Sequence, residues 1–255
     1  MRKTLMRSFM LIGICWFALE GVAQTAALPA AVPSVDSLQK QLAADQAKLM
    51  DWAQLDHYKA ENAALAAPTA AEKRVVFYGD SITQNWAGRN NIFFPGKPYV
   101  GRGISGQTSA QMVVRFHQDV VDLRPAVVVI LAGTNDVAEN TGPMTPEMTL
   151  DNFRSMAEMA RAIGIKVVIC SIPPAGDFPW RHGLEPVEKI RALNAMLEAW
   201  AKSGGLVWVD YYSVLADASG AMKSGLSLDG VHPTAAGYAI MAPLAEAGIQ
   251  KALGK

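Results

Sequence analysis

The chain has 255 residues, 51% of them hydrophobic, and its 23 basic residues balance its 23 acidic residues. This length allows one substantial domain with a short extension, and this composition excludes a wholly disordered chain. The charge balance also argues against a nucleic-acid-binding protein, which needs a basic face.

The first 23 residues have the pattern of a secretory signal peptide. Three basic residues precede an uncharged, mainly apolar stretch over residues 9–19, and small residues follow at Gly21 and Ala23. A membrane-spanning helix needs about 20 apolar residues, so this stretch is short for an anchor. We therefore expect cleavage near Ala23 and export to the periplasm or the exterior, with an uncleaved anchor as the alternative.

Residues 24–73 are expected to form an extension ahead of the main domain. An exit segment over residues 25–33 is followed by apolar residues at helical spacing from Ser34 to about Leu65, which predicts an amphipathic helix. The helix is expected either to pack on the domain or to serve in docking or dimerisation. Residues 66–73 then read as a linker.

Residues 74–255 are expected to form one α/β domain. Short β-branched or aromatic runs predict strands over residues 74–79, 126–133, 166–172 and 206–212, with a weaker strand over 98–103. Helical patterns lie between them, near residues 108–123, 147–163, 185–202 and 234–252. This alternation predicts right-handed crossovers and a parallel sheet covered on both faces. Cys170 falls within a predicted strand, so we expect a packed, unreactive thiol.

Four polar loops are expected to meet at one edge of this sheet. They follow the first three strands in the chain or precede the last helix, and the carboxyl ends of parallel strands share one edge. One of them contains Gly101, Gly103 and Gly106 in the spacing G-x-G-x-x-G. That spacing alone is a weak indication of a dinucleotide site.

His232 is the histidine with the strongest indication of chemistry. Asp229 stands three residues before it in a turn that contains glycine, so a carboxylate can reach the imidazole and stabilise its protonated form. An incidental ion pair in a turn is the alternative. The other histidines, His57, His117 and His182, are more consistent with structural roles.

Ser81 is the candidate nucleophile for such a base. It directly follows a predicted strand and begins a predicted helix, so its hydroxyl can lie at the edge where the loops meet. A serine hydroxyl becomes an effective nucleophile when a neighbouring base removes its proton. A helix cap is the alternative for Ser81 alone, and no G-x-S-x-G nucleophile elbow occurs in the chain.

Four stretches together resemble the sequence blocks of the SGNH, or GDSL-type, hydrolase family, in the family's order: YGDSITQNW (78–86), GRGISGQTS (101–109), LAGTNDVAEN (131–140) and SLDGVHPTAAGY (227–238). The resemblance implies a flavodoxin-like three-layer sandwich with strand order 2-1-3-4-5. It implies an esterase or acylhydrolase without cofactor or metal, with Ser81 as nucleophile, His232 as general base and acid, and Asp229 as the orienting carboxylate. The oxyanion hole would consist of the backbone N–H groups of Ser81 and Gly106 and the side-chain amide of Asn135.

The resemblance changes the interpretation of the glycine loop. A dinucleotide site places its glycines after the first strand of the unit and an acidic residue at the end of the next strand. Here the glycines follow the second strand in the chain, and Asp119 and Asp122 precede the next strand. Gly106 is therefore expected to let a bare N–H approach a developing oxyanion.

The substrate is less well defined by the sequence. Trp86, Phe178 and Trp180 could form a platform against a sugar face, or could fold onto the core. No long apolar insertion is present, which favours a short acyl group, such as acetyl, on a carbohydrate. A lysophospholipase or thioesterase is the runner-up, followed by a non-catalytic carbohydrate-binding protein and a nicotinamide-dependent oxidoreductase. The sequence leaves the oligomeric state open.

Overall fold

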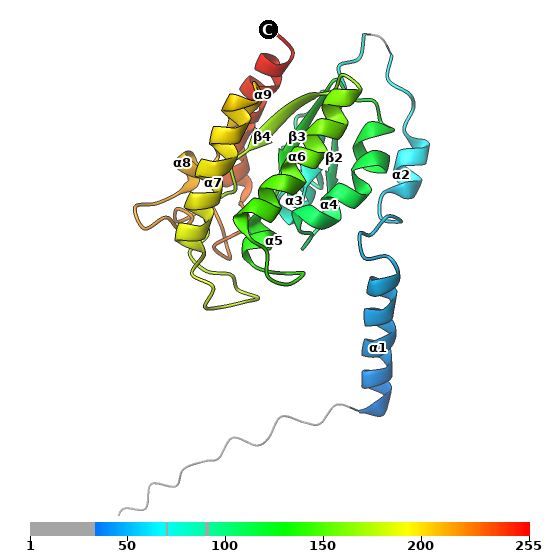
Figure 1. Ribbon diagram of the computed structural model, residues 1–255, viewed down its shortest axis with the longest axis vertical. Coiled ribbons are helices and arrows are strands. Elements are labelled where there is room, and N and C mark those ends of the chain that lie inside the picture. Colours follow the sequence, from blue (N-terminus) through cyan, green and yellow to red (C-terminus); the bar gives the residue numbers. More distant parts are fainter. Residues whose placement is uncertain (1–33, 70, 90–91) are drawn as a thin grey trace, which may run out of the picture. The chain divides into compact units, whose positions relative to one another are not determined.

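The computed structural model of the protein describes residues 34–69, 71–89 and 92–255 (Figure 1). The predicted signal peptide and exit segment lie outside these residues, so cleavage and export stay predictions. The chain divides into two compact units, residues 1–44 and 45–255. Of the first unit, residues 34–44 are described, and they belong mainly to helix α1 (Val35–Met50).

Five parallel strands form the sheet, in the order β2-β1-β3-β4-β5. β1 pairs with β2 on one side and with β3 on the other, so that Val75 lies opposite both Tyr99 and Val127. The strands are β1 (Val75–Gly79), β2 (Tyr99–Gly103), β3 (Val127–Leu131), β4 (Lys166–Cys170) and β5 (Val207–Val209). The predicted α/β fold with strand order 2-1-3-4-5 is therefore confirmed, including the weaker strand before Gly103.

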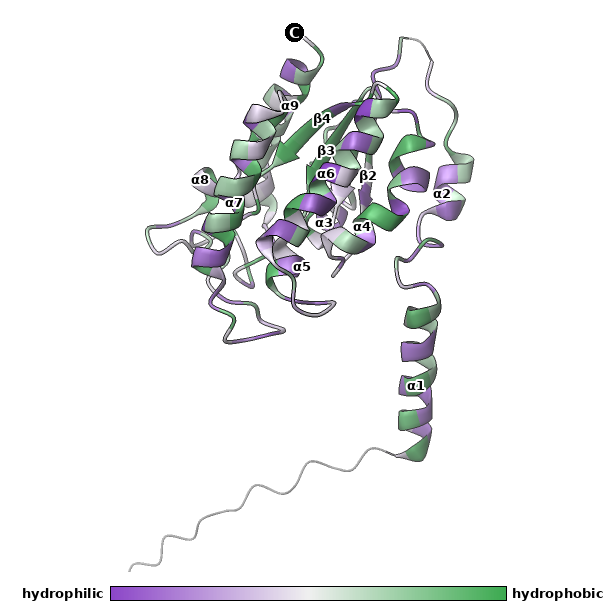
Figure 2. Cartoon of the chain, viewed as in Figure 1, coloured by the Kyte–Doolittle hydropathy of each residue, from purple (hydrophilic) through white to green (hydrophobic). Residues whose placement is uncertain are grey.

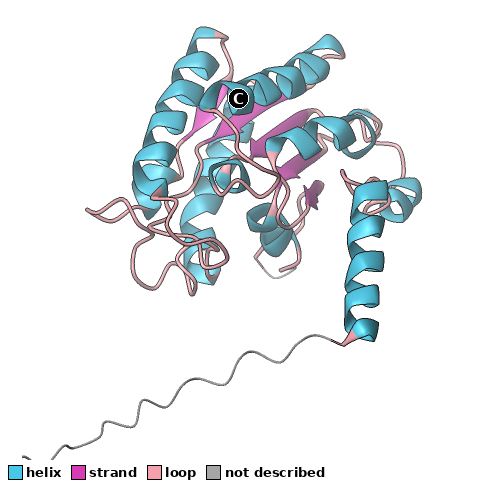
Figure 3. Cartoon of the chain, turned by 60° about the horizontal axis from the view of Figure 1, so that its bottom comes forward, coloured by secondary structure: helices cyan, strands magenta, loops and turns pink. Residues whose placement is uncertain are grey.

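Helices cover both faces of the sheet (Figure 3). One face packs on α3 (Ser81–Ala87), α8 (Tyr212–Leu215) and α9 (Ala235–Ala252). The other packs on α4 (Ser109–Phe116), the π-helical turn η1 (His117–Val121), α5 (Thr134–Val137), α6 (Pro146–Ala162) and α7 (Pro186–Ser203). Side chains of β1 alternate between the two faces: Phe77 packs in the core on the side of α9, and Tyr78 packs in the core on the side of α4. The hydropathy colouring of Figure 2 shows the apolar strands between helices of mixed character.

The predicted helix over residues 34–65 is interrupted. It consists of α1 and the short helix α2 (Lys59–Ala64), with turns between them. Asp51 causes the interruption, because its carboxylate accepts hydrogen bonds from the N–H groups of Leu55 and Asp56, at 2.7 and 3.2 Å. Gln54 adopts a left-handed conformation, with φ of 56°. The helical spacing of apolar residues in this stretch therefore gave a prediction that was too long.

Residues 51–62, called the strap below, are fixed against β2, α4 and η1. The amide groups of Gln107, Gln111 and Gln118 donate to strap carbonyls, and the hydroxyl of Tyr58 donates to the Gly103 carbonyl at the end of β2. The strap is thus built into the second unit.

No helix of the described part of the chain is both long and apolar enough to cross a bilayer.

Candidate active site

The predicted site residues meet at the carboxyl edge of the sheet. Ser81 begins α3 two residues after the end of β1, Gly106 follows β2, and Asn135 lies in α5 after β3. Asp229 and His232 lie in the loop before α9. Short connections after parallel strands place Ser81, Gly106 and Asn135 at this edge, and the loop before α9 adds Asp229 and His232.

Ser81, His232 and Asp229 form a continuous hydrogen-bonded chain. The Ser81 Oγ lies 2.8 Å from His232 Nε2, and His232 Nδ1 lies 2.5 Å from Asp229 Oδ2. A carboxylate next to Nδ1 favours the tautomer with its proton on Nδ1. In that tautomer Nε2 presents its lone pair to the Ser81 hydroxyl and can accept the hydroxyl proton.

The turn around Asp229 keeps this carboxylate ionised. Its partial burial opposes ionisation, but the His232 ring and the N–H groups of His232 and Val231 all donate to it and hold its pKa well below the ordinary value. Ser227 adds a hydroxyl donor at 3.0 Å. The carboxylate is therefore fixed in position and charge, as the orientation of a histidine requires.

Two backbone N–H groups at this edge of the sheet are candidates for binding an oxyanion. Ser81 is the first residue of α3, and the first N–H groups of a helix have no partner within the helix. Gly106 has a φ of +77°, and within the residues that the structure describes its N–H has no acceptor. A side chain is strained in that conformation, which explains the glycine.

Gly103 is the other glycine of this loop at which the structure shows why a side chain is excluded. A Cβ at this position would lie 2.3 Å from the N atom of Gln84 and 2.5 Å from the Asp80 carbonyl. Gly103 therefore lets the start of α3 approach the end of β2. In this spacing the glycines serve close packing and a left-handed turn, and they do not indicate a pyrophosphate site.

Asn135 lies at the site, but both of its N–H groups already have acceptors. Its Nδ2 donates to the Gln107 carbonyl at 2.9 Å and to Asp80 Oδ2 at 3.3 Å. Its Oδ1 accepts from Asn140 at 2.9 Å. The amide is thus firmly oriented, and the N–H on the longer bond is the one that a stronger acceptor can recruit.

Two of the three aromatic residues predicted to contact a sugar are core residues. Trp86 is 2% exposed and stacks on Tyr238 with ring centroids 5.1 Å apart, and Phe178 is 0% exposed. The prediction of a platform was wrong for both, because α3 and the loop after β4 turn these rings inward. Trp180 is 44% exposed and its ring centroid lies 6.1 Å from that of His232. It alone of the three can contact a bound molecule.

Asn140 links Trp180 to the residues around the candidate oxyanion hole. Its Oδ1 accepts from the Trp180 indole N–H at 2.9 Å, and its Nδ2 donates to the Gly106 carbonyl at 3.0 Å and to Asn135 Oδ1. Sequence reasoning did not single out Asn140. Its position in the third sequence block, five residues after Asn135, was the available signal.

Arg115 is a second residue that the sequence analysis did not single out. It supports the loops that carry the site. Its side chain is fully buried and donates to the carbonyls of Gly79 and Arg102, at 2.8 and 3.0 Å, and to the Gln107 side chain. Asp119, one helical turn later, pairs with it at 2.9 Å. Arg115 thereby ties the end of β1 and the end of β2 to the loop that contains Gly106.

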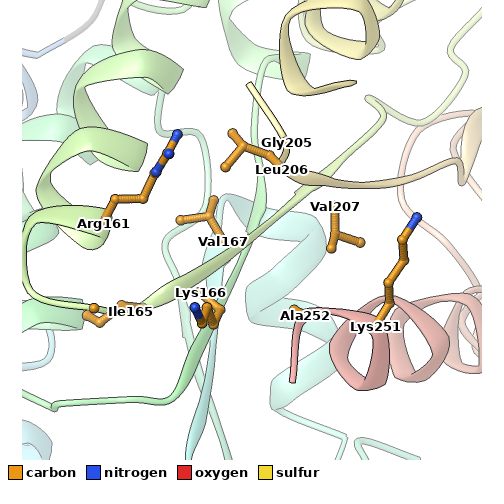
Figure 4. A pocket seen from close by; sticks show the side chains of 10 residues that line it. Arg161, Ile165, Lys166, Val167, Gly205, Leu206, Val207, Lys251 and Ala252 are labelled. Atoms are coloured by element: carbon orange, nitrogen blue, oxygen red, sulfur yellow. The ribbon is translucent and has the colours of Figure 1, made fainter. Parts of the chain in front are cut away.

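A separate pocket of about 340 Å³ lies at the opposite edge of the sheet (Figure 4). Lys166, the first residue of β4, lines it together with Arg161 and Lys251. The last two lie in the final turns of α6 and α9, where cations complement the free carbonyls of a helix end. This pocket is remote from Ser81.

The described residues contain no group of histidines, cysteines and carboxylates that could hold a metal ion.

Comparison with known proteins relates the chain to one family. The model of the GDSL-like lipase/acylhydrolase family matches residues 77–240. A solved structure described as a GDSL-like lipase, from Bacteroides thetaiotaomicron, is 48% identical with a TM-score of 0.76, over 78% of this chain and 98% of that chain. A solved structure described as a candidate acylhydrolase, from Bacteroides fragilis, is 45% identical with a TM-score of 0.77. The match covers 79% of this chain and 98% of that chain. Esterase TesA of Pseudomonas aeruginosa is 28% identical over 68% of this chain and 85% of its own length.

Proposed function

The chain belongs to the GDSL-like lipase/acylhydrolase family, and on that basis we propose that it cleaves carboxylic esters with Ser81 as nucleophile, His232 as general base and acid, and Asp229 as the orienting carboxylate. The observation that carries this proposal is the continuous hydrogen-bonded chain from the Ser81 hydroxyl through the imidazole to the Asp229 carboxylate, at 2.8 and 2.5 Å.

The first half of the reaction forms an acyl-enzyme. Ser81 Oγ attacks the ester carbonyl carbon while its proton passes to His232 Nε2, and Asp229 stabilises the resulting imidazolium. The tetrahedral intermediate then collapses, the ester C–O bond breaks, and the alcohol leaves with the proton from Nε2. The acyl group remains on Ser81.

The second half releases the acid. A water molecule gives a proton to His232 Nε2 and attacks the acyl carbon, and the second tetrahedral intermediate expels the Ser81 oxygen. That oxygen takes the proton back from Nε2. The carboxylic acid leaves, and the hydrogen-bonded chain of the resting protein is restored.

The negative oxygen of each intermediate needs donors that are already in place. The N–H groups of Ser81 and Gly106 supply two, and the Asn135 N–H that contacts Asp80 at 3.3 Å supplies the third by turning to the stronger acceptor. Removal of one such donor typically costs about 100- to 1,000-fold in kcat.

We propose a short acyl group on a carbohydrate as the substrate class. Trp180 offers an exposed indole face beside His232, and Asn140 adjoins it with polar atoms. Sugars present C–H faces to aromatic rings and hydroxyl groups to amides, so this combination of side chains suits them.

An ester with a longer acyl chain is the second candidate. A pocket of about 380 Å³ adjoins α5, which also carries Asn135, and half of its lining residues are apolar, among them Val137, Met144 and Leu193. Hydrocarbon would be buried favourably there. This pocket is the observation that favours a lysophospholipase or thioesterase.

An acyl-chain series tests the reaction and distinguishes the two candidates. We expect hydrolysis of p-nitrophenyl esters, loss of that hydrolysis in Ser81→Ala, and labelling of the wild-type chain by an organophosphorus ester at Ser81. A preference for acetate over octanoate supports the short-chain substrate. The reverse preference supports the second candidate.

A folded wild-type protein that neither hydrolyses these esters nor takes the label would contradict the proposal. Ser203→Ala serves as the matched control, because Ser203 is an exposed serine at the end of α7. It should keep both hydrolysis and labelling.

A further inference from the structure

We propose that the pocket between the strap and the loop that contains Gly106 is a subsite for neutral sugar units of the substrate, with Trp52 as its stacking surface. The inference rests on the proposed esterase function and extends it, because it assigns a place to the part of the substrate beyond the reacting ester.

The pocket has a volume of about 690 Å³, which is enough for more than one sugar unit. The strap forms one wall, and the loops after β2 and α5 form the other. An aromatic ring and several uncharged polar side chains line it: Trp52, Gln54, Ser105, Gln111, Asn140 and Thr141.

Trp52 is 42% exposed, although the backbone around it is fixed. The Trp52 carbonyl accepts from Gln111 Nε2 at 2.7 Å, and the carbonyl of the buried Ala53 accepts from Gln107 Nε2 at 2.8 Å. An exposed indole on a rigid backbone presents a large apolar face with little entropy left to lose on binding. That is the property a sugar-stacking surface needs.

Asn140 connects this pocket to the reacting centre. It lines the pocket, and its Nδ2 also donates to the Gly106 carbonyl and to Asn135 Oδ1. Its Oδ1 accepts a hydrogen bond from the indole N–H of Trp180, and the Trp180 ring is near His232. Two exposed tryptophans therefore flank one asparagine, and a chain of sugars can extend from the ester toward Trp52.

The charge of the lining favours neutral sugars. Among the described residues that line the pocket there is no lysine or arginine. Asp51 is the acidic lining residue, and its two carboxylate oxygens accept from the N–H groups of Leu55 and Asp56. Among the described lining residues, the side chains of Gln54 and Ser105 have no hydrogen-bond partner, so their amide and hydroxyl groups are available to sugar hydroxyl groups.

The test compares a small ester with an oligosaccharide ester. Trp52→Ala should lower kcat/KM for acetylated cellotetraose by roughly 2- to 12-fold, mainly through KM, because loss of an aromatic contact costs about 0.5–1.5 kcal/mol. Hydrolysis of p-nitrophenyl acetate should stay unchanged, since that ester is too small to reach Trp52. Trp52→Phe should restore most of the loss, because it keeps an aromatic face.

Met50→Ala is the matched control. Met50 is two residues away and exposed, and it does not line the pocket. Equal rates of Trp52→Ala and wild type on both substrates would overturn the inference, as would an equal loss on both or a wild-type protein that leaves the tetrasaccharide ester intact. A wild-type protein inactive on p-nitrophenyl acetate as well would instead contradict the proposed function.

Discussion

Asp80 is a fully buried carboxylate directly before the proposed nucleophile. Burial raises its pKa to about 7, against a smaller lowering by the Ile82 N–H, which donates to Oδ1 at 2.9 Å. Its Oδ2 accepts from Asn135 Nδ2. Asp80 thus caps α3 and orients a proposed oxyanion donor, whereas the more exposed Asp229 is held in its charged form.

The titration of Asp80 has a defined effect on stability. Its pKa in the folded protein, about 7, lies above the ordinary value of 3.8. Between these values the folded protein keeps a proton that the unfolded chain has released, so the Asp80 contribution to the free energy of unfolding falls as pH rises. Above pH 7 the contribution changes no further.

Asp80→Asn should remove this pH dependence. Asparagine still caps a helix but cannot ionise, so the variant should gain up to roughly 4 kcal/mol relative to wild type between about pH 4 and pH 7, since one pKa unit is about 1.4 kcal/mol. Urea unfolding of both proteins at several pH values measures the difference.

Asp217→Asn is the control for this measurement, because Asp217 is an exposed carboxylate without a histidine partner. The hydroxyl of Ser219 donates to Asp217 and lowers its pKa in the folded state, so its stabilising effect is complete above its unfolded pKa and is lost as pH falls through its folded pKa. Between about pH 5 and pH 7 this variant should run parallel to wild type. An Asp80→Asn curve that also runs parallel would contradict the raised pKa of Asp80.

The sequence indicated where the candidate site residues lie when the connections that place them are short. Asp229 and His232 are three residues apart, and Ser81, Gly106 and Asn135 all follow strand ends, so short connections determine their positions. Trp86 and Phe178 were candidates for a sugar platform, with burial in the core as the alternative, because exposed and buried aromatic residues look alike in a sequence. The burial of Trp86 depends on contacts with residues far along the chain, such as Tyr238.

Among the elements, α4 and η1 carry a buried ion pair that organises the site. The side chains of Arg115 and Asp119 are both 0% exposed, and the π-helical turn between α4 and β3 contains Asp119. The Arg115 guanidinium also lies over the Tyr78 ring, 4.3 Å from its centroid. This pair therefore links the sheet to the loop after β2.

Arg115→Met should destabilise the fold by about 3–5 kcal/mol, because it leaves the Asp119 charge buried without its partner. The double variant Arg115→Met/Asp119→Leu should recover much of that loss, since two apolar groups replace the pair. It should still have low kcat, because the Gly79 carbonyl and Gln107 have lost their donor. Urea unfolding and ester hydrolysis measure the two effects.

If the double variant recovered stability and turnover together, Arg115 would stabilise the fold without positioning the site. Arg154→Met is the matched control, because Arg154 pairs with Asp151 on the exposed side of α6. An exposed pair of this kind contributes little, so neither stability nor turnover should change appreciably.

Most core elements were predictable because every strand except β2 is a short apolar run and the long helices carry apolar residues at helical spacing. The helix predicted over residues 34–65 was too long because neither glycine nor proline marks the interruption. The turn there depends on the Asp51 side chain and on the left-handed Gln54. Asn62 in α2 bonds to Asp119 and Arg102, so tertiary contacts also hold the second piece.

At the scale of the whole molecule, the chain before Asp45 and the strap should differ in their effect on stability. Residues 1–44 form a separate unit, whereas the strap is bonded to β2, α4 and η1. A chain that begins at Asp45 should keep the Tm and the p-nitrophenyl acetate activity of the chain that begins at Ser34. A chain that begins at Ala67 should lose both, because Gln107 loses the Ala53 carbonyl.

Thermal unfolding and ester hydrolysis of the three chains check this expectation. Full activity of the shortest chain would show that the strap is dispensable for the reacting centre. A large loss in the chain that begins at Asp45 would show that residues before Asp45 contribute to the second unit.

The strap also changes what the outer strand of the sheet can do. β2 stands at the edge with β1 as its neighbour, and such an edge can recruit a strand from another molecule. Two of its carbonyls are already occupied: Gly103 accepts from the Tyr58 hydroxyl, and Gly101 accepts from the Arg102 guanidinium. Being two residues apart, they point to the same side of the strand. A foreign strand would have to displace both donors, which protects the molecule from edge-to-edge aggregation.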